Sequence, residues 1–156
     1  MCGDVTGSKL SKNLIRESNQ RCAVVHGTDN LLVDGNVAYD TFGHCFLVED
    51  GMERNNMFSN NLGAKTQNVI DKIPDLPAAN NGRETDNQAA TFWITNPSNS
   101  WENNVAAGGQ NSGYWFELRG SVRGTTGDMY DFNPRTMPII SFKNNVAHSF
   151  DRAGIR

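Results

Sequence analysis

Three titratable side chains end short apolar runs and could transfer protons. They are His26 in CAVVH, Glu49 in CFLVE and Glu117 in GYWFE. If the runs are stacked strands, His26 and Glu49 are neighbours and could form an acid–base pair. Glu49 and Glu117 would be two strands apart, about 9.6 Å between backbones, which is compatible with the paired carboxylates of an inverting glycosidase. The alternative is a column of solvated polar residues without chemistry.

Two tryptophans occupy equivalent positions in the runs TFWITN and GYWFEL. As neighbours in one column, Trp93 and Trp115 would be about 4.8 Å apart, and exposed aromatic faces in a row suit the apolar face of a sugar ring. We add Asn96 and Arg119, which follow these strands, to the predicted substrate-binding set. The alternative is that neighbouring loops cover both tryptophans.

Signals for cofactors are weak. The acids of EDG (49–51) could help to bind calcium, although two adjacent acids at a bend are more often a solvated turn. The sequence has no glycine-rich phosphate loop, no CxxC zinc pair and no nucleophile elbow. We therefore predict no cofactor and no metal site.

These residues must be positioned by a repeated element. A large apolar residue, any residue, a small or polar residue, Asn, and then Val or Leu recur five times, at spacings of 23, 25, 43 and 41 residues. The first two spacings suit single coils of a parallel β-helix, and the last two suit coils that carry an insertion. The five repeated asparagines are Asn13, Asn36, Asn61, Asn104 and Asn145.

A second regularity sets the register of the coils. Nine residues after the repeated Asn, four of the five coils begin a strand, and the third coil reaches TFWITN after 21 extra residues. Because side chains alternate along a strand, one column is predicted to form the core and the other the outer face. The core column comprises Ala23, Val25, Phe46, Val48, Phe92, Ile94, Tyr114 and Phe116.

The repeated Asn predicts an internal ladder. Every coil must bend at the same place, and a buried amide there can bond to the backbone and to the Asn of the next coil. We predict an all-β, right-handed parallel β-helix of about five coils, since parallel crossovers are strongly right-handed. Residues 1–156 form one domain with inserted loops at about 64–90 and 119–138, which could wall a groove over the tryptophans.

Cys22 and Cys45 share one register position on neighbouring coils. Backbones about 4.8 Å apart fall within the range that a disulfide accepts, and two stacked thiols are the alternative. A disulfide would imply an oxidising compartment.

Composition and charge limit the fold class and the kinds of partner that the chain could have. The chain of 17.2 kDa contains 20 Asn and 15 Gly, which favours short strands and tight bends over a helical bundle. Neither the acidic stretch 29–90 nor the more basic stretch 105–156 is basic enough for nucleic acid. No apolar run is long enough to span a membrane, and the first residues lack a secretory signal. Taken literally, this predicts a cytoplasmic protein without membrane contact.

A family resemblance contradicts that literal interpretation. At RCAVVHGTDNLLVDGNVAYDTFGHCFLVEDG, TFWITNPSNSWENNVAAGGQNSGYWF and FKNNVAHS, the sequence resembles the β-helix region of the cell migration-inducing hyaluronan-binding protein and cell-surface hyaluronidase family, and more distantly fibrocystin-like receptors. The resemblance covers residues 10–63 and 89–156. It implies an extracellular or cell-surface location, hyaluronan or a related glycan as partner, and further β-helix coils in a longer parent protein. It also implies an aliphatic residue where Glu117 stands.

Two functions compete at this stage. One is a segment that binds or depolymerises a hyaluronan-like glycan, so that the chain would be part of a glycosidase-like enzyme. The other is a structural β-helix of a receptor or adhesion protein. An open outer column lined by Trp93, Trp115, Glu49 and His26 would favour the first. The net charge of −3 does not attract a polyanion, so attraction would come from local bases, namely Arg119, Arg123, Arg135 and Arg156.

Overall fold

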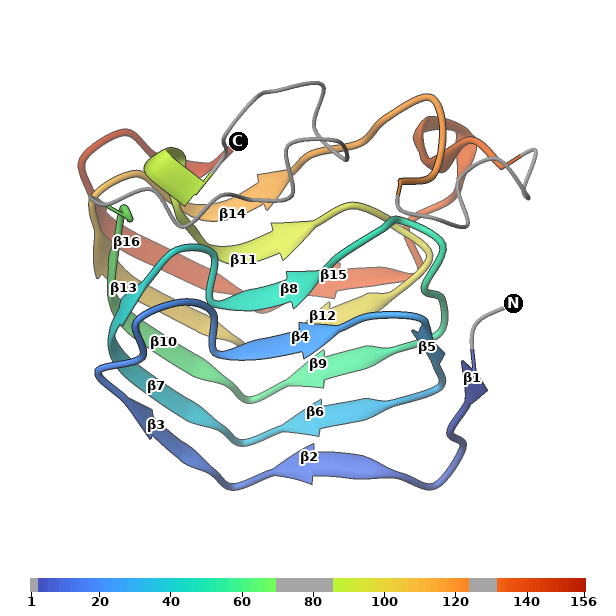
Figure 1. Cartoon of the computed structure of the whole chain (residues 1–156), viewed down its shortest axis with the longest axis horizontal. Helices are drawn as coiled ribbons and strands as arrows, with labels where there is room; N and C mark the ends of the chain where they lie inside the picture. Colours follow the sequence, from blue (N-terminus) through green and yellow to red (C-terminus); the bar gives the residue numbers. More distant parts are fainter. Residues whose placement is uncertain (1–2, 70–85, 124–131) are drawn as a thin grey trace.

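The computed structural model describes residues 3–69, 86–123 and 132–156. Its coils are stacked along one axis, with the first coil at the bottom of Figure 1. Each coil adds one strand to each of three five-stranded sheets, and all strand pairs in these sheets are parallel. The predicted all-β parallel β-helix of about five coils is confirmed.

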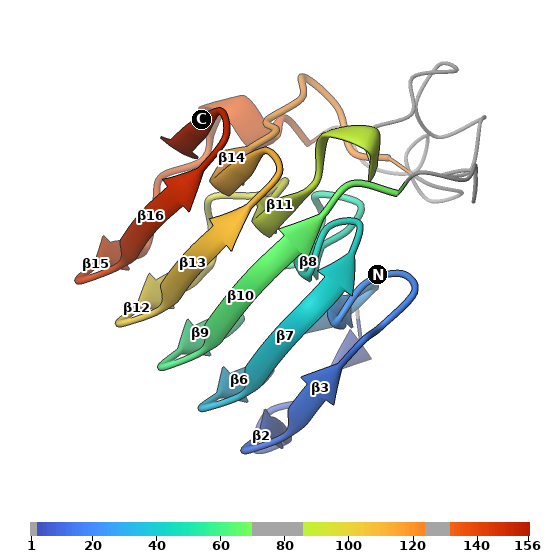
Figure 2. The same ribbon diagram turned by 90° about the vertical axis from the view of Figure 1, so that its left-hand side faces the viewer.

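The three sheets follow one another round each coil. Sheet 1 comprises β2 (Lys9–Ser11), β6 (Leu32–Asp34), β9 (Met57–Ser59), β12 (Ser100–Glu102) and β15 (Ser141–Lys143). Sheet 2, which faces the viewer in Figure 2, comprises β3 (Leu14–Arg16), β7 (Val37–Phe42), β10 (Leu62–Gln67), β13 (Val105–Gly109) and β16 (Val146–Phe150). Sheet 3 comprises β4 (Ala23–Val25), β8 (Phe46–Val48), β11 (Ala90–Ile94), β14 (Ser112–Phe116) and β17 (Ala153–Ile155).

Shorter elements lie outside the three sheets. The strands β1 (Gly3–Asp4) and β5 (Thr28–Asp29) pair with each other. Two single-turn 3-10 helices, Asp86–Gln88 and Pro134–Thr136, precede β11 and β15.

The predicted asparagine ladder runs along the bend between sheets 1 and 2. Each of the first four ladder asparagines donates two hydrogen bonds to Oδ1 of the next Asn, one from its backbone N–H and one from its Nδ2–H, at 2.8–3.1 Å. From the second Asn onward, Nδ2 also donates to a carbonyl of sheet 1, as from Asn61 to Val33. The three middle amides are at most 1% exposed and fully bonded. The ladder is therefore confirmed as a structural device.

The residue before each ladder Asn has a left-handed backbone. Its φ lies between 54° and 65° in all five coils, and the residues are Lys12, Gly35, Asn60, Asn103 and Asn144. Gly and Asn tolerate this conformation better than other residues do. The Asn–Asn pairs of the repeat thus combine two functions: the first Asn turns the chain and the second bonds to the next coil.

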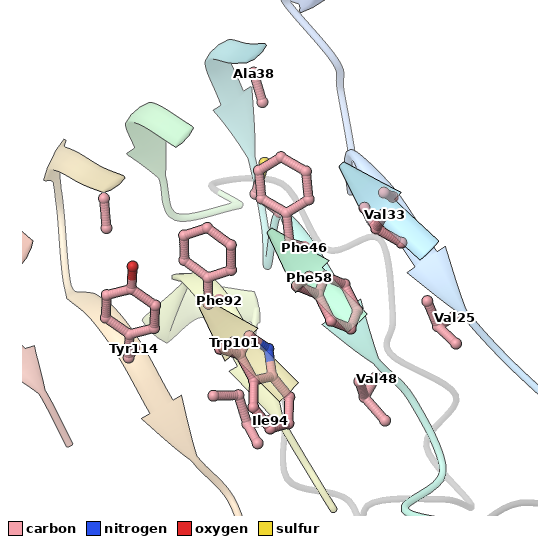
Figure 3. Packing of buried hydrophobic residues seen from close by; sticks show 13 residues of the cluster. Val25, Val33, Ala38, Phe46, Val48, Phe58, Phe92, Ile94, Trp101 and Tyr114 are labelled. Carbon is pink, nitrogen blue, oxygen red and sulfur yellow. The ribbon is translucent and has the colours of Figure 1, made fainter. Parts of the chain in front are cut away.

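Aromatic side chains stack inside the coils as the core column predicts. Phe46 and Phe92 have ring centroids 5.0 Å apart, and Phe92 and Tyr114 are 4.7 Å apart (Figure 3). Phe58 and Trp101 form a second stack that extends from sheet 1. Each such side chain contributes about 1.5–3 kcal/mol when fully buried.

A disulfide joins the first two coils where they enter sheet 3. Of the two alternatives for Cys22 and Cys45, the structure has the covalent bond, with Cα atoms 4.5 Å apart. It ties together coils that are 23 residues apart in the sequence.

The first insertion begins later than predicted. Residues 64–67 belong to β10, because Lys65 adopts a left-handed φ of 56° and lets the strand bend while it stays paired with β7. The predicted loops 64–90 and 119–138 include residues 70–85 and 124–131, which lie outside the described residues. Their arrangement as walls of a groove therefore stays a prediction.

Candidate functional site

The outer side of sheet 3 carries most of the predicted site residues. Trp93 pairs in register with Leu47 on one side and with Trp115 on the other. The predicted column is therefore correct, and it places both tryptophans on neighbouring strands.

The predicted exposure of this column is wrong at the tryptophans. Trp93 is 3% exposed and Trp115 is 6% exposed, and their ring centroids are 4.7 Å apart. The guanidinium of Arg156 lies 3.7 Å from the centre of the Trp115 ring, and that of Arg123 lies 5.5 Å from a Trp93 ring centre. These cation–π contacts occupy the aromatic faces that the sequence analysis reserved for a sugar.

A buried histidine completes the aromatic cluster. The ring of His44 lies 3.8 Å from that of Trp93, and its Nδ1 accepts the backbone N–H of Ala90. The side chain is 1% exposed. His44 was not predicted as a site residue, because it precedes its strand and falls outside the alternating columns.

An imidazole lies between two carboxylates at the far end of β4 and β8. His26 Nδ1 is 3.1 Å from Glu49 Oε2, and its Nε2 is 3.1 Å from Asp50 Oδ2. The His26 side chain is 60% exposed, whereas that of Asp50 is only 11% exposed. The predicted contact between His26 and Glu49 is present, and Asp50 joins it as the second acid of EDG. An accessible imidazole with two carboxylate partners can exchange protons with a ligand.

A buried carboxylate lies in the loop behind this group. Glu53 is 0% exposed and accepts the backbone N–H groups of Gly27 at 3.0 Å and Gly51 at 2.9 Å. Burial raises the pKa of the Glu53 carboxyl. Glu53 was not predicted as a site residue, because its contacts depend on the path of two loops, which no periodicity encodes.

Glu117 has partners other than the predicted ones. Its Oε1 is 3.3 Å from both Arg119 Nε and Arg123 Nη2. The backbone N–H of Arg123 in turn donates to the carbonyl of Asp50 at 2.9 Å, so residues 117–123 reach from the end of β14 to the loop after β8. Glu117 thus neutralises arginines, and we do not retain it as a proton donor.

Arginines gather around β14 and β17. We call this group the arginine cluster, and its members are Arg119, Arg123, Arg135, Arg152 and Arg156. Arg135 Nε donates to the Leu118 carbonyl, and the side chains of Arg152 and Arg156 both donate to Gln88 Oε1, at 2.9 and 3.1 Å. Burial, with Arg152 beside it, lowers the pKa of Arg156. Closely spaced guanidinium groups favour the approach of an anion.

Asn96 is unavailable to a ligand. Its side chain is 0% exposed, its Nδ2 donates to the Gly51 carbonyl, and its Oδ1 accepts the N–H of Ser98. It belongs to a bend that also holds Asn99, whose Oδ1 accepts two hydrogen bonds from Asn56. Asn56 and Asn99 form a second, shorter amide ladder that the sequence analysis missed.

In residues 3–69, 86–123 and 132–156, no group of three or more His, Cys, Asp and Glu side chains could hold a metal ion. At the EDG bend, Asp50 contacts His26, and the N–H of Gly51 is donated to Glu53. None of the helices in the described part of the chain has the length and apolar character needed to cross a membrane.

The chain is a parallel β-helix protein, because its coils stack into sheets of parallel strands and an amide ladder runs along one bend. Within that class the chain belongs to the CEMIP β-helix family, whose model matches residues 1–155. The family resemblance seen in the sequence is thus confirmed.

Curated relatives align over most of this chain. It is 35% identical to the human cell surface hyaluronidase CEMIP2 and 33% identical to the human cell migration-inducing and hyaluronan-binding protein, over 99% and 90% of its own length. It is also 33% identical to human fibrocystin-L over 86% of its length. The chain spans only 13%, 12% and 3% of these three proteins. The activities that their names state belong to much longer proteins.

Proposed function

We propose that this chain is the β-helix segment of a cell-surface protein, and that its arginine cluster binds an acidic polysaccharide of the hyaluronan type. The observation that carries the proposal is the concentration of five arginines around β14 and β17 in a chain whose net charge is −3. Two relatives carry hyaluronan or hyaluronidase in their names, which supports the same class of ligand.

Binding should be mainly ionic. Because arginine side chains already cover Trp93 and Trp115, a sugar could stack on the indole rings only by displacing them. Ionic contacts at a surface are screened within about 8–10 Å at physiological salt. Affinity should therefore fall steeply as salt rises, with a smaller salt-insensitive remainder than open tryptophans would give.

The test is titration calorimetry with hyaluronan oligosaccharides at low and high salt. We expect Arg119→Ala and Arg156→Ala each to weaken binding by more than about 0.5 kcal/mol, the scatter of an uninvolved surface change. The matched control is Arg16→Ala on sheet 2, where the arginine pairs with Glu17. A neutral dextran of equal length should not bind. Equal affinities for the parent chain and both cluster variants would refute the proposal.

The group formed by His26, Glu49 and Asp50 favours a second function, depolymerisation of the bound glycan. Hydrolysis of a glycosidic bond needs a proton for the leaving oxygen and a base that takes one from the attacking water. His26 can supply the first proton, and Glu49 or Asp50 can accept the second once the bound glycan and its water separate that carboxylate from the imidazole it now contacts. The group lies on the same face as the arginine cluster, because Arg123 N–H bonds to the Asp50 carbonyl.

Release of reducing ends from hyaluronan tests the second function. Acid–base residues contribute roughly 10²- to 10⁴-fold, so His26→Gln should remove most of the activity. His148→Gln is the matched control, since His148 is exposed on sheet 2 and contacts Ser149. If the parent chain binds hyaluronan without cleaving it, the first proposal stands alone. If it neither binds nor cleaves, a structural β-helix without chemistry is the remaining function.

A further inference from the structure

The most unusual titratable group in the described residues is the carboxylate of Glu53. Carboxylates are almost never fully buried unless they are paired. In the described part of the chain, Glu53 has no cationic partner and instead accepts backbone N–H groups from Gly27, Asp50 and Gly51. Burial raises its pKa, and the negative charge of Asp50 acts in the same direction.

These hydrogen bonds join two neighbouring coils at the candidate acid–base group. Oε1 accepts the N–H of Gly27, the residue after His26, at 3.0 Å, and that of Asp50 at 3.4 Å. Oε2 accepts the N–H of Gly51 at 2.9 Å. One side chain therefore holds both the backbone that follows His26 and the backbone that carries Asp50.

We propose that Glu53 is a positioning residue that fixes the His26 imidazole between Glu49 and Asp50. The proposal deepens the depolymerising function and rests on it only for its catalytic consequence. An exposed ion pair alone is worth little and would not hold a side chain 60% exposed in one orientation. Reactive groups keep their geometry when buried hydrogen bonds hold the backbone beneath them.

The test uses two substitutions that leave the loop length unchanged. Glu53→Gln keeps the shape but has a single acceptor oxygen, so it cannot serve Gly27 and Gly51 together. Glu53→Asp keeps the charge but is one methylene shorter. Glu102→Gln is the matched control, because Glu102 is a carboxylate on sheet 1 that accepts a hydrogen bond from Ser141.

The first readout needs no glycan. The χ1 rotamer populations of His26, measured by NMR scalar couplings at fixed pH, should show one dominant rotamer in the parent chain and in Glu102→Gln. They should show averaging in either Glu53 variant. The charged groups to hold constant are Glu49, Asp50, the neighbouring Arg54, and Asp29, which accepts the N–H of Arg54.

The second readout is kinetic. If the parent chain cleaves hyaluronan, the Glu53 variants should lower kcat by about tenfold with little change in KM, less than the loss expected for removing the acid–base group itself. Averaging of His26 without any cleavage by the parent chain would keep the positioning role and reject the catalytic function. A single His26 rotamer in both Glu53 variants, or in the one that folds, would overturn the proposal.

Discussion

The same coils build two regions that differ in how their residues repeat: the bend with the asparagine ladder, and the outer side of sheet 3. At the bend, one residue type repeats in every coil, and each middle amide is buried and fully hydrogen-bonded. On the outer side of sheet 3 the residue type varies from coil to coil: the residues paired in register along one column are Val24, Leu47, Trp93 and Trp115. A residue type that is the same in every coil therefore indicates a role in stability. Positions where the residue type varies from coil to coil indicate the face that is available for function.

The largest effect should come from breaking the ladder in its middle. Asn61→Ala removes an acceptor that serves two donors of Asn36 and a donor to Asn104. Each buried group left without a partner costs about 1–3 kcal/mol, so the free energy of unfolding should fall by about 3 kcal/mol or more. Urea denaturation measures it. Asn13→Ala, at the exposed end of the ladder, should cost less than half as much, and equal losses would contradict the ladder's role.

The second-largest loss of stability should come from removing the disulfide. Replacing both Cys22 and Cys45 by Ser opens a loop of 23 residues, and cross-links of this length contribute about 3 kcal/mol. The unfolding midpoint in urea should fall to that of the parent chain measured with a reductant. An unchanged midpoint would show that the first coil is held by its other contacts alone.

The pH dependence of stability should separate Glu53 from the surface carboxylates. Because burial raises its folded pKa, Glu53 stabilises the fold fully below its unfolded pKa of about 4.3, and this contribution is lost as pH rises through the folded value. The stability difference between the parent chain and Glu53→Gln should therefore shrink as pH rises above the unfolded pKa. Asp34, whose pKa is lowered by bonds from Ser59 and Asn60, acts in the opposite direction in both proteins and cancels.

A difference that is constant with pH would show that Glu53 ionises in the folded protein as it does in the unfolded chain. Chemical denaturation at several pH values, with Glu102→Gln as the control, measures it.

The smallest effect should come from the turn residue beside the ladder. Asn103 has a φ of 57°, which a β-branched residue tolerates poorly. Asn103→Val should cost about 1–2 kcal/mol, whereas Asn103→Gly should change stability by less than about 0.5 kcal/mol. Thermal unfolding of the two variants checks this, and an equal loss in both would mean that the Asn103 side chain matters more than its backbone.

The sequence predicts what repeats and little of what does not. The ladder, the core column and the pairing of Trp93 with Trp115 follow from periodicity, since stacking forces equivalent residues into register. The burial of Trp93 could not be predicted, because Arg123 reaches it from the segment after β14, which leaves the repeat, whereas Arg156 follows β17 at the register position next to Trp115. Glu53 was missed for the same reason, because its partners are backbone groups of two loops.

The central claim is that the ladder bend has a structural role and that sheet 3 carries the function. Mapping hyaluronan binding by NMR tests this claim most directly. In ¹H–¹⁵N spectra, increasing amounts of a hyaluronan oligosaccharide should shift the amides of residues 117–123 and 152–156. The amides of the ladder and of the outer side of sheet 2, such as Val37 and Tyr39, should remain unchanged. Shifts confined to sheet 2, or no shifts at saturating oligosaccharide, would contradict the account.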